Sequence, residues 1–201
     1  MKIKKMLSLL IAIALVTCAF VPTAFAAELY ETGEINTSDI SLSGNEMSPK
    51  MQRAITYNDL AVGETQFAGQ FEDGTALYVT LISDTNSDPM TRATSKVTSK
   101  SWMFQTVNVF GVKVDAFKVA MKCYWTEDGS DSEIQTLNGT YTIYDSSFTC
   151  SWDEDNASAN PTYHALPLDV YHGGGSAYYI FDAILNTLVS PATCTISYGV
   201  W

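Results

Sequence analysis

The chain has 201 residues, with 11 lysines and arginines against 22 acidic residues, and a net charge of −11. No lysine or arginine follows Lys122, so the rest of the chain has no such cation to neutralise a phosphate group. The composition therefore excludes nucleic acid as a partner and argues against an anionic membrane surface.

The N-terminus has the features of a secretory leader. Three lysines precede an apolar run that is too short to span a bilayer, and Ala24 and Ala26 then form a small-residue cleavage motif. We therefore expect residues 1–26 to be a signal peptide, the protein to be secreted, and the mature chain to have no membrane-spanning segment. A lipoprotein lipidated at Cys18 is the alternative. Cleavage would leave 8 lysines and arginines against 22 acids, a net charge of −14.

The mature chain divides into two parts by composition. Residues 27–62 are polar and poor in apolar side chains, which predicts a flexible N-terminal arm. Residues 63–201 alternate between β-prone runs and turn residues, which predicts one folded domain.

Two hairpins are expected where a glycine turn separates β-prone runs. The first turn is at Asp73-Gly74 and the second at Asn138-Gly139, and both dipeptides favour tight turns between antiparallel strands. Between them, the alternating stretch 112–125 changes its apolar parity after Ala116. A one-residue shift of this kind indicates a β-bulge or a strand that crosses between sheets.

Several further short strands follow, including 148–152 and 193–200. Ile180, Ile184 and Leu188 fit helical spacing, so we expect one short helix over 182–189. The set as a whole predicts an all-β, antiparallel β-sandwich that is immunoglobulin-like in outline.

Three cysteines follow the leader, and each lies on the apolar side of an alternating stretch: Cys123, Cys150 and Cys194. They are either three small buried hydrophobic residues or one disulfide and one thiol. The pairing does not follow from the sequence. Cys123 and Cys150 are the first pair to test, because the two strands that contain them share a Cys-x-Trp pattern.

An acidic run at 127–133 and a second at 153–155 suggest a metal site. Carboxylates from two neighbouring loops would suit calcium, and the candidate ligands are Asp128, Asp131, Asp153 and Asp155. Neither run has the spacing of a helix-loop-helix calcium loop. The simpler interpretation, which we favour, is that both are the solvated ends of hairpins, with no cofactor.

Other catalytic or metal chemistry has weaker support. The acids lie on polar turns with nothing to raise a carboxyl pKa, which disfavours a glycosidase. His172 and the three glycines after it resemble an esterase oxyanion motif, but the chain has no Gly-x-Ser-x-Gly. His164 could share a face with His172, but no third metal ligand is obvious.

Aromatic residues are numerous enough to leave some on the surface. Exposed rings on a sandwich can stack on sugars or anchor a protein contact, and the candidates are Trp152, Tyr163 and Tyr171. The ligand would be a glycan or a surface protein.

Four short motifs, in this order behind such a leader, carry a resemblance: Lys100-Ser-Trp102, Phe110-Gly-Val-Lys-Val114, Cys123-Tyr-Trp125 and Asn138-Gly-Thr-Tyr141. The chain resembles small secreted β-sandwich proteins of unknown function from Gram-positive bacteria. This resemblance implies export and fold, and it supplies no catalytic residues.

We therefore expect a secreted, non-enzymatic bacterial protein that acts as a binding or surface-associated module. The alternatives are a secreted hydrolase that uses the acidic loops, and a structural or toxin-like exported protein.

Overall fold

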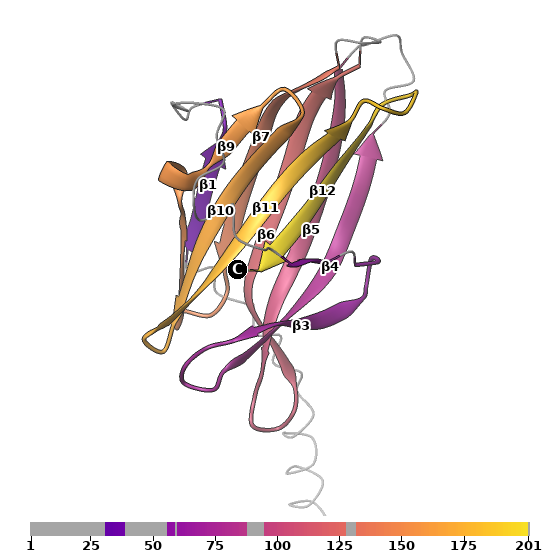
Figure 1. The fold of residues 1–201 in the computed structure, drawn as a ribbon. Helices are drawn as coiled ribbons and strands as arrows, with labels where there is room; N and C mark the ends of the chain where they lie inside the picture. Colours follow the sequence, from indigo (N-terminus) through magenta and orange to yellow (C-terminus); the bar gives the residue numbers. More distant parts are fainter. Residues whose placement is uncertain (1–30, 39–55, 59, 88–94, 128–131, 201) are drawn as a thin grey trace, which may run out of the picture.

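A computed structural model describes residues 31–38, 56–58, 60–87, 95–127 and 132–200, which form two antiparallel β-sheets (Figure 1). The strands are β1 (Glu31–Asn36), β2 (Thr56–Asn58), β3 (Thr65–Gln70), β4 (Ala76–Ser87), β5 (Ser95–Val107), β6 (Lys113–Thr126), β7 (Glu133–Ile143), β8 (Phe148–Trp152), β9 (Ser158–Asn160), β10 (Tyr163–His172), β11 (Gly175–Asn186) and β12 (Thr193–Val200). A single turn of 3-10 helix, η2 (Glu154–Asn156), lies between β8 and β9.

The two sheets are built mainly from strands that are adjacent in sequence. Sheet A has the order β1-β7-β6-β5-β4-β3, and sheet B has the order β2-β12-β11-β10-β8, with β9 also paired to β10. The predicted all-β sandwich is confirmed. Within the described residues, no helix is long and apolar enough to cross a bilayer.

The core lies between the sheets and is rich in aromatic rings. Phe104 of β5 stacks on Phe117 of β6, with ring centroids 4.5 Å apart, and meets Tyr179 of β11 edge-on at 5.1 Å. Trp102 reaches Phe181 of sheet B at 5.3 Å. Alternate residues of each strand supply these contacts, because successive side chains of a strand point to opposite faces.

Two local predictions are confirmed. The Asp73-Gly74 turn joins β3 to β4, and Gly74 has a φ of +89°, which favours glycine. The parity change after Ala116 is a β-bulge, since the pairing of β5 with β6 shifts by one residue there. The bulge buries both Ala116 and Phe117.

The hairpin predicted at Asn138-Gly139 is wrong, because both residues lie inside the continuous strand β7. Gly139 is extended, and the place of its missing side chain is filled by a ring from the other sheet. A Cβ on Gly139 would lie 2.8 Å from two atoms of the Trp152 indole. The glycine is therefore required for packing and makes no turn.

The short helix predicted over 182–189 is also wrong, because β11 continues to Asn186. Ile180 and Ile184 are four residues apart, a spacing that places them on one face of a strand as well as of a helix. Here β11 pairs with β10 on one side and with β12 on the other, so the segment forms a strand and not a helix.

Parts of the segment predicted to be a flexible arm belong to the sheets. β1 pairs with β7 at one edge of sheet A, and β2 pairs with β12 at one edge of sheet B. Ile35 and Leu60 are buried in the common core. The arm prediction is therefore wrong for these strands, and the signal peptide predicted at residues 1–26 lies outside the described residues.

Candidate binding site

The β5–β6 hairpin ends in an apolar tip that projects beyond the two sheets (Figure 1). Its outermost side chains are Val109, which is 94% exposed, and Phe110, which is 86% exposed. Three further valines on the flanks of the hairpin are 41–57% exposed: Val107, Val112 and Val114. We call these five residues the apolar tip.

The turn that holds the tip is ordered by one asparagine side chain. Asn108 Oδ1 accepts hydrogen bonds from the backbone N–H groups of Phe110 and Val112, both at 3.0 Å. The backbone of Asn108 also bonds to Gly111 and Val112 at 2.9 Å. Gly111 has a φ of +76°, a conformation that glycine adopts without strain. The backbone N–H groups of Asn108, Phe110, Gly111 and Val112 are therefore hydrogen-bonded within the loop, while its apolar side chains are exposed.

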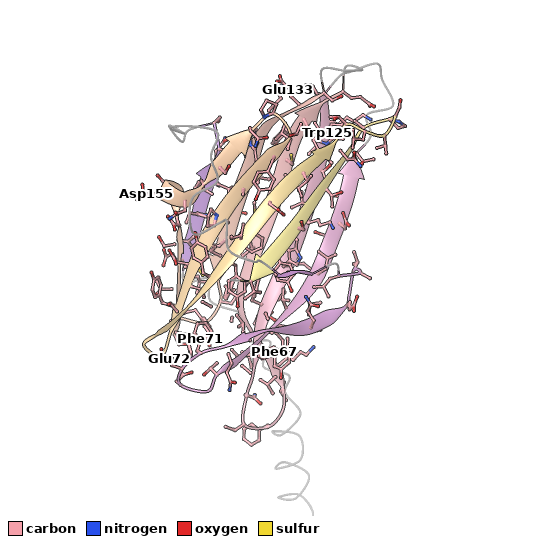
Figure 2. The ribbon with its side chains drawn as sticks, viewed as in Figure 1. Phe67, Phe71, Glu72, Trp125, Glu133 and Asp155 are labelled. Atoms are coloured by element: carbon pink, nitrogen blue, oxygen red, sulfur yellow. The ribbon has the colours of Figure 1, made fainter. Side chains whose placement is uncertain are left out.

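The base of the hairpin is tied to the rest of sheet A. Lys113 Nζ donates to Thr65 Oγ1 of β3 at 3.2 Å, and Gln105 donates to Asp115 Oδ1 across the hairpin at 2.7 Å. Phe67 of β3 is also exposed, and its ring meets that of Tyr78 edge-on with centroids 5.9 Å apart. Figure 2 places Phe67 at the end of the molecule from which the hairpin projects. The tip is thus a fixed projection with a further exposed ring near its base.

Such a tip is costly in water. Scattered exposed apolar residues are ordinary, whereas a contiguous group at a projection marks a contact surface. Full burial of one Val or Phe side chain stabilises by about 1.5–3 kcal/mol. Burying Val109 and Phe110 against another apolar surface would therefore yield several kcal/mol, within reach of a specific, reversible contact.

The three predicted binding aromatics do not form one surface. Trp152 faces the core, where its ring lies 6.1 Å from Tyr141 and 6.2 Å from Phe181. Tyr163 is half-buried on the opposite face of sheet B, in a small cluster with Ala165, Tyr178 and Ile180. Tyr171 is 47% exposed at the far end of the same strand.

The predicted metal ligands are described only in part, since Asp128 and Asp131 lie outside the described residues. Asp153 Oδ2 accepts hydrogen bonds from Asn156 Nδ2 at 2.6 Å and from the Tyr178 hydroxyl at 3.0 Å. Asp155 is exposed on η2, well away from Glu133 in Figure 2. Among the described residues, no three potential ligands gather around one point.

The acidic run at the end of β6 begins with a residue that has a structural role. Glu127 Oε2 pairs with Lys96 Nζ at 2.5 Å, and its Oε1 accepts the backbone N–H of Ala192 at 2.9 Å. The Lys96 ammonium also lies 5.1 Å from the Trp125 ring centroid. Glu127 therefore links β5 and β6 to the connection before β12.

The two histidines are at opposite ends of β10, about 26 Å apart along an extended strand, so they cannot share a metal ion. His172 stacks on Phe148 at 4.3 Å and lies 3.3 Å from Asp73 Oδ2. The glycines after it form the turn to β11, with positive φ at Gly173 and Gly174. His164 is buried, and its Nδ1 lies 3.0 Å from Thr37 Oγ1.

The three cysteines that follow the leader are buried thiols, as their place on the apolar faces predicts. The pair predicted for testing, Cys123 and Cys150, is not the close pair. Cys123 Sγ lies 3.5 Å from Cys194 Sγ of the other sheet. Burial raises the pKa of Cys150 to about 12.

A second feature lies on the outer face of sheet A. It is a hollow of about 370 Å³ over Ala120, which has Ser101 and Thr140 as its strand neighbours. The Lys122 ammonium lies 4.9 Å from the Tyr124 ring centroid beside it. The remaining lining residues are Glu34, Ser99, Met121 and Asn138.

Comparison with known proteins gives no relative from which a site could be transferred. No protein-family profile matches the chain, and no curated protein or solved structure matches it significantly. Sequence reasoning did not single out the apolar tip. Its signal was present in Val-Asn-Val-Phe-Gly-Val, where a turn between two strands is made of apolar residues.

Proposed function

We propose that this protein is an exported, non-enzymatic attachment module whose apolar tip docks into an apolar cleft on a partner protein. The observation that carries this proposal is the exposure of Val109 and Phe110 at the end of an internally bonded hairpin. A convex apolar projection fits a concave apolar cleft, as aromatic anchors do at protein interfaces.

Charge favours a protein partner with a basic rim over a lipid bilayer. Three exposed carboxylates lie at this end of the molecule, on Glu72, Asp73 and Asp115, against the exposed ammonium of Lys113. The chain as a whole carries −11. An anionic bilayer would repel this surface, whereas basic residues around a cleft would attract it and speed encounter.

The test is site-specific photo-crosslinking on intact cells. A benzophenone amino acid at position 110 should give a discrete protein adduct, and Val109→Ser should reduce that adduct strongly. The matched control is the same probe at position 188. Leu188 is 96% exposed in the connection between β11 and β12, at the other end of the sandwich, and should give no such adduct.

Two results would overturn the docking proposal. The first is equal labelling from positions 110 and 188, which would show that exposure alone explains the adduct. The second is binding to zwitterionic vesicles that Phe110→Ser abolishes, which would make the tip a lipid anchor. Neither substitution removes a buried contact, so the folded state should be unaffected within about 0.5 kcal/mol.

The hollow on sheet A supports a second candidate function, the binding of a short glycan. An aromatic ring, an amide, a carboxylate and several hydroxyls around a shallow hollow are groups that bind sugar hydroxyls and stack on sugar rings. A glycan array tests it with Tyr124→Ala and Asn138→Ala, and with Phe110→Ser as the control. Binding that survives both hollow substitutions would exclude this site.

A further inference from the structure

Two thiols from opposite sheets meet at the end of the sandwich away from the apolar tip. Cys123 lies near the end of β6 and Cys194 near the start of β12, and their sulfur atoms are 3.5 Å apart. Figure 2 shows the neighbouring Trp125 at this end, opposite Phe67. Both cysteines are buried, with 0% and 5% exposure.

The surroundings of the two sulfurs shift the pKa values of the two thiols in opposite directions. Thr98 is the strand neighbour of Cys123, and its hydroxyl accepts the Trp125 indole N–H at 3.1 Å. Hydrogen bonding with Cys123 and with Thr98 lowers the pKa of Cys194, against the opposing effect of burial. The hydrogen bond to Cys194, together with burial, raises the pKa of Cys123. Cys194 is therefore the thiol that ionises first.

The third thiol is separated from this pair. Cys150 lies on β8 beside Val170, and the charge of Glu31 adds to burial in raising its pKa. Cys194 lies on β12, which β11 and β10 separate from β8 in the same sheet. The topology thus places one close pair at one end and a single thiol elsewhere.

We propose that Cys123 and Cys194 form a disulfide that joins the two sheets when the chain meets an oxidising compartment, and that Cys150 remains a thiol. The sulfurs must approach from 3.5 Å to about 2.05 Å, a closure that side-chain rotation and small strand shifts supply. This site does not depend on the apolar tip or on the attachment function.

The reaction is a thiol–disulfide exchange with an external disulfide such as oxidised glutathione. The Cys194 thiolate attacks one sulfur of that disulfide, and one external thiol leaves. The Cys123 thiolate then attacks Cys194 in the mixed disulfide, and the second external thiol leaves. Two protein S–H bonds become one S–S bond, and the external disulfide is reduced to two thiols. Cys194 is the second residue of β12, so fraying of this strand end gives the oxidant access.

The test is a redox titration of the purified chain in oxidised and reduced glutathione, followed by acid quenching, unfolding and alkylation with N-ethylmaleimide. Peptide mapping should show Cys123 joined to Cys194, with alkylation of Cys150 undiminished. Cys150→Ser should keep the cross-link, whereas in Cys123→Ser the cross-link should be absent and Cys194 should be recovered as a mixed disulfide with glutathione or as an alkylated thiol.

The wild-type peptide map decides the outcome even if a variant fails to fold. Full alkylation of all three cysteines, under conditions that oxidise a known structural disulfide, would overturn the proposal. A cross-link that contains Cys150 would overturn it as well.

Discussion

His164 gives the sandwich a pH dependence that can be calculated. It is buried at the start of β10, and its Nδ1 lies 3.0 Å from the hydroxyl of Thr37, just after β1. Thr37 is held in turn by the Leu137 backbone N–H, which donates to its Oγ1 at 2.9 Å. The imidazole therefore connects the edge of one sheet to the other sheet.

Burial lowers the pKa of His164 to about 4, against an opposing hydrogen bond with the backbone of Asn160. The unfolded chain has the ordinary histidine pKa of about 6.5, so it binds more protons than the folded chain between these values. The contribution of neutral, buried His164 to the free energy of unfolding is fully present above pH 6.5. It is lost as the pH falls from 6.5 toward 4, because the unfolded chain takes up the proton first. At pH 5 the loss amounts to about 2 kcal/mol, which lowers Tm by about 4–8 °C.

The assay is thermal unfolding of wild type and His164→Gln at pH 7.5 and pH 5. His164→Gln should have a lower Tm than wild type at pH 7.5. Between pH 7.5 and pH 5 its Tm should fall by less than that of wild type, because the glutamine amide does not titrate. His172→Gln is the control, and it should keep the part of the acid-induced fall in Tm that comes from His164. The decisive comparison is between wild type and His164→Gln, because His172→Gln also removes a charge partner of Asp73. An identical acid loss in wild type and His164→Gln would refute the reasoning.

Three further predictions concern packing and the cross-link. Phe104→Ala should cost about 3–5 kcal/mol in urea unfolding, because Phe104 packs against rings of both sheets; a cost below 1 kcal/mol would contradict that. Gly33→Ala should cost about 1–3 kcal/mol, since its Cβ would lie within 2.5 Å of the Tyr141 ring, whereas exposed Thr32→Ala should change little. Oxidation of the thiol pair, 71 residues apart, should stabilise by about 4 kcal/mol and raise Tm by about 8–16 °C, a gain that Cys194→Ser should abolish.

The sequence was most informative where one physical signal had a single interpretation. Strict alternation predicted 193–200 as a strand, and β12 spans those residues. The one-residue parity change after Ala116 predicted either a bulge or a crossing between sheets, and the structure has the bulge, in which one extra residue changes the face of the strand. Fold class followed from many such short runs.

It was misleading where one residue serves two purposes. An Asn-Gly pair favours a tight turn through positive φ, yet Gly139 is needed for its lack of a side chain, so that Trp152 can pack on β7. No local pattern identifies the ring that will cover a glycine, since it comes from a distant strand. β1 was missed for a related reason: an edge strand that buries only Ile35 looks like a polar arm.

The candidate site was missed because only aromatic residues elsewhere in the chain, Trp152, Tyr163 and Tyr171, were considered as exposed binding residues. The pattern of Val107 to Val114 continues the alternation of its strands, and only the turn at Asn108 and Gly111 marks its centre. Whether the ends of two strands are covered by the other sheet depends on the tertiary packing of the sheets, which the local sequence pattern does not specify. In this fold β5 and β6 extend past the edge of sheet B, which leaves their tip uncovered (Figure 1).

The apolar tip lies around the start of β6, whereas Cys123 of the thiol pair lies near the end of that strand, and the aromatic core lies between them. Perturbations that share no contacts add independently, within about 0.5 kcal/mol. Attachment through the tip should therefore have the same affinity in the oxidised and the reduced protein, while unfolding should differ between them. Equal affinities would establish that the tip is a preformed surface, independent of how firmly the far end is closed. A several-fold difference would instead mean that the strands transmit strain along their length, and the tip would then act as part of a redox-responsive sandwich.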